Sequence, residues 1–184
     1  MKKVAVLFHN GFEELEALSV VDIMRRAGVT CTMVGMNEDE VTSSHQIKIK
    51  MDLVYDNNLD DYDMIVIPGG MPGATNLRDD PRVIELVKQF NQANKIIGAI
   101  CAGPIVLQKA GVITGKTVTC YPGFETQLTS ANYQEALVQV DENIVTGKGP
   151  AAALAFGYTL LEQLGYNSDD IKEGMQYNYL SKNI

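Results

Sequence analysis

Short apolar runs alternate with longer amphipathic segments along almost the whole chain, and this alternation constrains the fold more than any other feature. Residues 4–8 and 63–67 have the composition of buried strands, whereas residues 13–27 and 81–94 place apolar side chains at helical spacing. Parallel strands need helical crossovers, so the pattern predicts a mostly parallel sheet that is covered by helices on both faces. The 184 residues suit a single domain that spans residues 1–184.

Other segments fit the same plan. Further strands are expected at 29–36, 96–100 and 117–120, a hairpin at 137–146, and helices from Pro104 onward and over 151–164. Residues 41–44 and 47–51 differ, because the alternation of Ile and Lys in the second of them is typical of a half-exposed excursion from the main sheet.

The ends of the predicted strands indicate where a functional site would lie. In sheets of this kind, ligands bind beyond the carboxyl ends of the strands. This rule selects four places: residues 9–12, residues 69–74, the turn at Cys101, and residues 121–124. Candidate residues that are far apart in the sequence should therefore meet at one edge of the sheet.

The turn at Cys101 has the strand–turn–helix context of a nucleophile elbow, in which a sharp turn lifts one side chain above the sheet. Ala102 and Gly103 follow the cysteine and Pro104 begins a helical pattern, and such small neighbours suit a tight backbone. A helix N-terminus favours a thiolate, which predicts a pKa below that of a free thiol. The alternative is that Cys101 is a small hydrophobic residue of the core.

Glu16 is the candidate partner of this sulfur. It opens the first predicted helix, where acidic residues are favourable for electrostatic reasons alone. Its neighbours at helical spacing are Ser19, Val20 and Ile23, so its face of the helix is small and apolar. A carboxyl group that is partly buried there would have a raised pKa, and its protonated form could donate a hydrogen bond to a thiolate.

Gly69 and Gly70 directly follow the strand predicted at 63–67 and Pro68. They either form a tight turn or bring backbone N–H groups close to a ligand oxygen, as an oxyanion hole requires. Together with Gly73 they do not make the G-x-G-x-x-G dinucleotide fingerprint, and the segment around Lys148 is not a P-loop. The sequence therefore predicts no nucleotide cofactor, and no cofactor of another kind is expected.

The chain contains two histidines, His9 and His45. A papain-like mechanism needs a histidine beside the cysteine, and only His9 follows a strand that ends at the expected site. A solvated loop histidine is the alternative interpretation of His9. No pair of His, Cys or carboxylate residues has the sequence spacing of metal ligands, so no metal site is expected.

Charge and cysteine content restrict the environment and the partners. A net charge of −8 argues against binding to nucleic acid or to an anionic membrane surface. No apolar run approaches the ~18 residues of a membrane span. The three cysteines, Cys31, Cys101 and Cys120, lack C-x-x-C spacing and are odd in number, which fits free thiols in a reducing cytoplasm.

Four segments, in order along the chain, resemble the DJ-1/PfpI family, and in particular its bacterial DJ-1-like (YajL-like) branch. They are FEELE at 12–16, VDIMRRAG at 21–28, IPGG at 67–70 and AICAGP at 99–104. The resemblance continues through GKGP at 147–150. It implies an α/β, flavodoxin-like (class I glutamine amidotransferase-like) three-layer sandwich, which usually forms a homodimer.

The resemblance also implies roles for individual residues. The oxidation-prone cysteine of the family corresponds to Cys101, and its partner glutamate corresponds to Glu16. The backbone amide that holds an oxidised sulfur or a substrate oxygen corresponds to Gly70, with Gly69 and Ala102 beside it. Activities attributed to the family include protection against oxidative stress, chaperone behaviour, and conversion of glyoxals or repair of glyoxal-modified proteins.

The sequence departs from the family pattern at four positions. Tyr121 stands where DJ-1 has a histidine, and tyrosine is a poor base at neutral pH because its pKa is about 10. Ala102 stands where the PfpI-type protease branch has a histidine, which argues against peptidase activity. Two arginines of an anion site in DJ-1 correspond to His45 and Lys148, so a cationic site with weaker bidentate geometry is expected.

Two functions stay open on the sequence alone. As an enzyme, Cys101 would attack a small reactive carbonyl such as methylglyoxal, Glu16 would move protons, and Gly70 with the elbow amides would stabilise the oxyanion. As a sensor, Cys101 would react with a peroxide, and its oxidised form would change stability or a partner interface. The missing histidine favours the sensor slightly, because proton transfer would depend on Glu16 alone.

Overall fold

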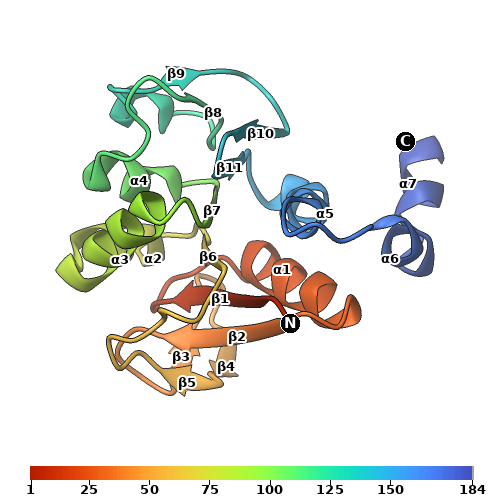
Figure 1. The fold of residues 1–184 in the computed structure, drawn as a ribbon, viewed down its shortest axis with the longest axis horizontal. Helices are drawn as coiled ribbons and strands as arrows, with labels where there is room; N and C mark the ends of the chain where they lie inside the picture. The colour runs from red at the N-terminus through yellow and green to blue at the C-terminus, as the bar shows by residue number, and fades with distance from the viewer. Residues whose placement is uncertain (184) are drawn as a thin grey trace.

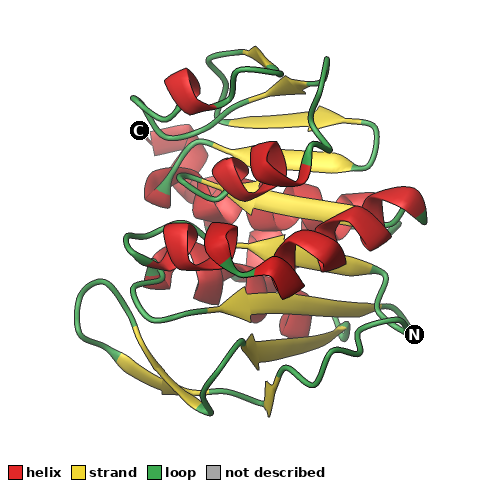
Figure 2. Cartoon of the chain, turned by 90° about the vertical axis from the view of Figure 1, so that its left-hand side faces the viewer, coloured by secondary structure: helices red, strands yellow, loops and turns green. Residues whose placement is uncertain are grey.

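A seven-stranded sheet forms the centre of the molecule in the computed structural model, which describes residues 1–183 (Figure 2). Its strands, in spatial order, are β10 (Val138–Asp141), β11 (Ile144–Gly147), β7 (Ile96–Ile100), β6 (Met64–Ile67), β1 (Lys3–Phe8), β2 (Thr30–Gly35) and β5 (Leu53–Val54). Neighbouring strands run parallel except β10, which pairs antiparallel with β11. The predicted mostly parallel sheet is confirmed.

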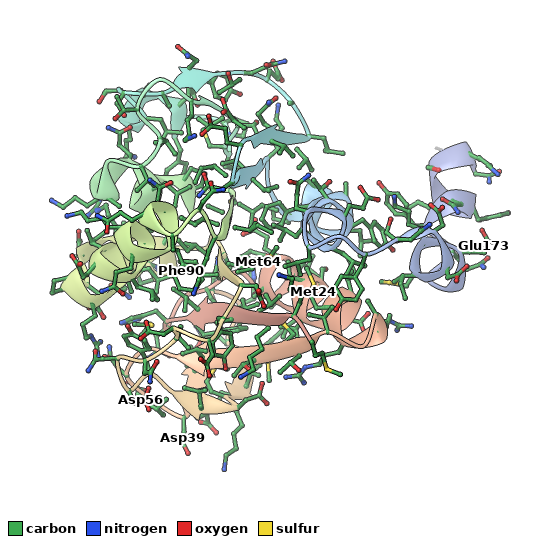
Figure 3. The ribbon with its side chains drawn as sticks, viewed as in Figure 1. Met24, Asp39, Asp56, Met64, Phe90 and Glu173 are labelled. Carbon is green, nitrogen blue, oxygen red and sulfur yellow. The ribbon has the colours of Figure 1, made fainter. Side chains whose placement is uncertain are left out.

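Helices cover both faces of this sheet (Figure 1). One face carries α1 (Glu14–Arg26) and α5 (Ala153–Gln163), and the other carries α2 (Gly73–Asp79), α3 (Pro81–Gln92) and α4 (Pro104–Ala110). Each face has its own apolar core: Met24 of α1 packs in the first with Met64 of β6, whereas Phe90 of α3 packs in the second (Figure 3). Burial of these two layers against one sheet gives the three-layer sandwich that the sequence predicts.

Smaller elements lie outside the main sheet. Strands β3 (Glu40–Thr42) and β4 (Lys48–Lys50) form the separate antiparallel ribbon expected for the excursion. Strands β8 (Thr117–Val118) and β9 (Asn132–Tyr133) form a second pair, so the strand expected at 117–120 is shorter than predicted and lies outside the main sheet. Short 3₁₀ turns occupy Glu125–Gln127 and Pro150–Ala152, and α6 (Asp169–Gly174) and α7 (Tyr177–Asn183) complete the chain.

The helices differ from the prediction in two respects. The helix predicted at 151–164 begins as a 3₁₀ turn, and α2, α6 and α7 were not predicted because they are short and have few buried residues. Within residues 1–183, no helix combines the length and the apolar character that crossing a bilayer would require.

The carboxyl ends of the strands bring distant loops together, as the topology predicts. The Glu13 N–H donates a hydrogen bond to the Gly69 carbonyl at 3.0 Å, which joins the loops that follow β1 and β6. The Tyr121 N–H donates to the Cys101 carbonyl at 3.0 Å, which joins the loop after β8 to the turn after β7. Residues from four segments therefore surround one point at the edge of the sheet.

Candidate active site

Cys101 lies in a tight turn between β7 and α4, with a left-handed backbone angle φ of 62°. This conformation is uncommon for a residue other than glycine, and hydrogen bonds hold it on both sides. The Cys101 N–H donates to the Gly147 carbonyl at 2.9 Å, while its own carbonyl accepts from Tyr121. A Cβ at Gly103 would lie 2.6 Å from the Ile67 carbonyl oxygen, so only glycine fits there. The turn is a nucleophile elbow, as the sequence predicts.

Glu16 lies in the first turn of α1 and is fully buried. Its Oε2 atom accepts a hydrogen bond from the Gly69 N–H at 2.8 Å, and its Oε1 atom is buried without a hydrogen-bond partner among residues 1–183. A Cβ at Gly69 would lie 2.6 Å from both the Cys101 Cβ and Glu16 Oε2. The bare backbone of Gly69 therefore allows the carboxyl group and the cysteine to approach each other.

The protonation of the two side chains is coupled. Burial raises the pKa of Glu16 to about 7, although the Cys101 thiol and the Gly69 N–H both favour its ionised form. Burial also raises the pKa of Cys101, and the negative charge of Glu16 raises it further, while the backbone N–H groups of Ala102 and Gly70 lower it.

The expectation of a lowered Cys101 pKa is therefore wrong. The sequence shows the helix N-terminus that would stabilise a thiolate, but not how deeply the sulfur is buried or how close a carboxylate lies. In the structure, burial of the sulfur and the nearby Glu16 carboxylate outweigh the hydrogen bonds from the Ala102 and Gly70 N–H groups. Cys101 carries its proton at rest, and a base must remove that proton when the sulfur attacks.

Glu16 is the group that can act as this base. Above a pH of about 7 its carboxylate is ionised beside the thiol, and it can accept the thiol proton as the sulfur attacks an electrophile. The N–H groups of Gly70 and Ala102 point toward the sulfur and can stabilise negative charge there. Gly70 adopts φ +86°, and a Cβ there would lie 2.4 Å from the Glu13 nitrogen, so this amide is held by close backbone packing.

Comparison with known proteins places this elbow in a family. Residues 2–163 match the sequence model of the DJ-1/PfpI family. The chain belongs to the DJ-1/PfpI family. Its assignment to the bacterial branch within that family stays a prediction.

Relatives and solved structures agree with this assignment. A zebrafish (Danio rerio) protein, Parkinson disease protein 7 homolog, is 36% identical over 173 residues, which cover 89% of each chain. A Schizosaccharomyces pombe protein named glutathione-independent glyoxalase DJ-1 is 34% identical over 176 residues, which cover 89% of this chain and 92% of that protein. The crystal structure of Drosophila melanogaster DJ-1beta superposes with a TM-score of 0.91 at 31% identity and covers 95% of this chain and 97% of that one.

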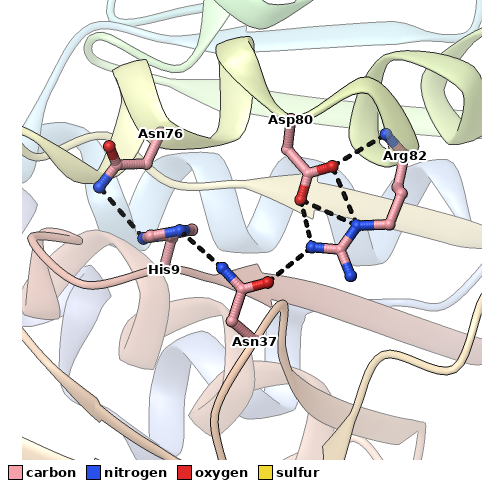
Figure 4. Close-up of polar contacts among 5 residues, drawn as sticks. All are labelled: His9, Asn37, Asn76, Asp80 and Arg82. Carbon is pink, nitrogen blue, oxygen red and sulfur yellow. Dashed lines mark hydrogen bonds and ion pairs between the residues drawn. The ribbon is translucent and has the colours of Figure 1, made fainter.

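His9 takes part in a polar network with Asn37 and Asn76 (Figure 4). The amide nitrogens of Asn37 and Asn76 each lie 3.1 Å from one of its two ring nitrogens. Asn37 in turn accepts a hydrogen bond at 2.7 Å from Arg82, which is paired with Asp80. His9 therefore lies between the end of β1 and helices α2 and α3, with an amide nitrogen beside each ring nitrogen, and a neutral imidazole can accept a hydrogen bond from only one of the two.

The two residues that correspond to the DJ-1 arginines, His45 and Lys148, both lie beside acidic side chains. The Nδ1 atom of His45 lies 2.8 Å from Glu14 Oε1, and the Nζ atom of Lys148 lies 2.7 Å from Glu135 Oε1. The cationic site expected near the cysteine stays a prediction, and in the structure a carboxylate lies beside each of the two side chains that would form it.

Tyr121 lines an open pocket beside the elbow. The pocket has a volume of about 270 Å³ and is lined mainly by apolar groups, with Pro122, Leu137, Lys148 and Pro150 among them. The Tyr121 ring is half-exposed and lies close to Gly149. Leu137 and Pro150 were not among the predicted site residues, because only the fold brings the hairpin and the 3₁₀ turn to this place.

The remaining cysteines and Glu13 have structural positions. Cys31 and Cys120 are buried, and burial raises the pKa of Cys31 to about 12 and that of Cys120 to about 11, so both are protonated at neutral pH. Glu13 is the N-cap of α1, and its Oε2 atom accepts a hydrogen bond from the Glu16 N–H at 2.8 Å. The general preference for acidic residues at a helix start is enough to explain why Glu13 stands at this position. Its role in positioning Glu16 is visible only in the fold.

Proposed function

We propose that this protein is a cysteine-dependent glyoxalase that converts small α-oxoaldehydes such as methylglyoxal to 2-hydroxy acids without a cofactor. The observation that carries the proposal is the buried carboxyl group of Glu16, which lies beside the Cys101 thiol and has a pKa of about 7. A base with a pKa near the working pH is suited to proton transfer. The name of the Schizosaccharomyces pombe relative supports the same chemistry.

The reaction divides into steps that these groups can perform. Cys101 Sγ attacks the aldehyde carbon while Glu16 accepts the thiol proton and passes it to the former aldehyde oxygen, which gives a hemithioacetal and leaves Glu16 ionised again. Glu16 then transfers a proton from the former aldehyde carbon to the former ketone carbon, and the hydroxyl proton moves to the former ketone oxygen, so the first carbon is oxidised and the second reduced. Water hydrolyses the resulting thioester and releases the hydroxy acid and the thiol. The overall change is methylglyoxal plus water to lactate, with no external oxidant or reductant.

Backbone amides would stabilise the charged intermediates. The N–H groups of Gly70 and Ala102 reach the sulfur, and Gly69 already donates to the carboxyl group. Donors held rigidly by backbone packing are worth more in a buried site than in water. Repair of glyoxal-modified proteins would use the same attack on a larger adduct.

The test is an assay with the full chain and methylglyoxal in the absence of glutathione. We expect loss of methylglyoxal to be matched by an equal amount of lactate, measured with a lactate dehydrogenase of each stereospecificity. A chain with reduced Cys101 that produces no lactate would refute the proposal. Treatment with peroxide before the assay should abolish the activity, because an oxidised sulfur is no longer a nucleophile.

A redox sensor or redox-regulated chaperone is the second candidate. One observation favours it: Glu16 Oε1 is buried and, within the described residues, has no hydrogen-bond partner, so the protonated carboxyl group could donate a hydrogen bond to a sulfinic oxygen on Cys101. Peroxide should then add two oxygen atoms to Cys101 alone and change thermal stability, while no lactate is formed in the assay.

We further propose a homodimer in the cytoplasm, supported by half-exposed apolar side chains such as Leu15 and by three free thiols.

A further inference from the structure

Two carboxylates and one imidazole converge at the start of α1. One ligand atom from each of Glu13, Glu14 and His45 lies within 4.8 Å of the other two. Glu13 and Glu14 begin the helix, whereas His45 comes from the turn between β3 and β4. The Ser44 N–H donates a hydrogen bond to the Phe12 carbonyl at 2.8 Å, so the turn is fixed to the helix start beside the three side chains.

A buried oxygen atom in this cluster lacks a partner. Glu14 Oε1 contacts His45 Nδ1 at 2.8 Å and the Ser43 hydroxyl lies near the same carboxyl group, but Glu14 Oε2 is buried and receives no hydrogen bond of good geometry from any residue of the described chain. A buried polar atom of this kind calls for a partner, because leaving it unsatisfied is unfavourable. Glu13 beside it is also buried, with 8% of its surface exposed, so two acidic groups are close together.

We propose that Glu13, Glu14 and His45 bind a divalent transition-metal ion of the Zn²⁺ class. An imidazole nitrogen with carboxylate oxygens is a donor set of Zn²⁺ and Co²⁺ sites, whereas Ca²⁺ and Mg²⁺ sites use oxygen ligands. Ligands at about 2.0–2.1 Å from a tetrahedral ion are roughly 3.3 Å apart. The spacings observed here, from 2.8 Å up to 4.8 Å, include that separation. Three protein ligands would leave at least one position for water.

This site could not be predicted from the sequence. The ligands lie in two segments that are far apart in the chain, so no ligand spacing exists to be recognised. The exposed imidazole is free to turn toward an ion, since 68% of the His45 side chain is accessible. The site includes neither Cys101 nor Glu16, so its existence does not depend on the proposed glyoxalase function, although Glu13 also accepts the hydrogen bond from the Glu16 N–H.

The test is a titration of the metal-free full chain with Co²⁺, followed by its visible absorption, and then displacement by Zn²⁺. The chain has only two histidines, which provides a matched pair of variants. We expect one equivalent of Co²⁺ to bind, His45→Ala to weaken binding at least about tenfold, and His9→Ala to leave it unchanged. Glu14→Gln should weaken it likewise, with circular dichroism to confirm folding.

Thiol ligation is the competing outcome. If Co²⁺ gives a sulfur charge-transfer band that disappears in Cys101→Ser, the ion is bound by the cysteine and the proposal is wrong. Binding by His45→Ala that is as tight as wild type also overturns it. His45→Ala is expected to fold normally, because its side chain is exposed, so this result is decisive even if Glu14→Gln is unstable.

Discussion

Replacement of Cys101 by serine is expected to reduce kcat/KM for methylglyoxal by about a thousandfold or more, because the attacking atom is lost. A serine hydroxyl is far less acidic than a thiol, so a carboxylate with a pKa of about 7 cannot deprotonate it effectively. The Gly70 and Ala102 amides would remain, and they alone do not form a hemithioacetal. The measurement is the initial rate of lactate formation at several methylglyoxal concentrations.

The other two cysteines provide the matched controls for this variant. Cys31 and Cys120 are buried, and burial raises the pKa of each well above neutral. Cys31→Ala and Cys120→Ala should therefore keep kcat/KM within about threefold of wild type, since neither thiol reacts at neutral pH. Equal activity in Cys101→Ser and wild type would show that the lactate is formed elsewhere on the protein.

Replacement of Gly70 by alanine should destabilise the fold by about 3 kcal/mol or more, since both backbone strain and overpacking act there. Gly70 has φ +86°, and an added Cβ would lie 2.4 Å from the Glu13 nitrogen and 2.5 Å from the Gly11 carbonyl oxygen. These are backbone atoms, which cannot move aside as a flexible side chain could. The free energy of unfolding from a denaturant titration measures the effect.

Gly28→Ala separates the two causes of this loss. Gly28 has a similar angle, φ +74°, but in the described structure no atom lies within 4 Å of the added Cβ. Its substitution should cost only about 1–2 kcal/mol, from the left-handed backbone alone. If Gly70→Ala costs no more than Gly28→Ala, the close packing of the two strand-end loops is not what holds the Gly70 amide in place.

Several features of the site could be predicted because they depend on local backbone patterns. The apolar run at 96–100, followed by Cys101 and small residues, predicts an elbow without any knowledge of the surrounding structure. Gly70 and Cys101 follow neighbouring parallel strands, so the rule that sites lie at the carboxyl ends of strands predicts both residues at the same edge of the sheet. Glu16 was found from its apolar helical neighbours, which indicated burial and a raised pKa.

Features that depend on contacts between distant side chains could not be predicted. The direction of the Cys101 pKa shift depends on how closely Glu16 approaches, and Gly69 determines that distance. The pairing of His45 with Glu14 and of Lys148 with Glu135 depends on two hairpins whose placement no sequence period encodes. Residue type predicts the charge of such a group, whereas its partner is set by the fold.

Alkylation of Cys101 as a function of pH tests most directly the claim that Glu16 activates this sulfur. Iodoacetamide is added to the native chain and to Glu16→Gln from about pH 5 to 9, with EDTA present, and each cysteine is quantified by mass spectrometry of its peptide. In wild type, Cys101 should react faster than Cys31 and Cys120, and its rate should rise through an inflection near pH 7, where the Glu16 carboxyl ionises and becomes the proton acceptor. In Glu16→Gln the inflection should disappear, and the rate at pH 7 should fall by about tenfold or more. Identical profiles in the two proteins, or a Cys101 that reacts no faster than the other cysteines, would contradict the account.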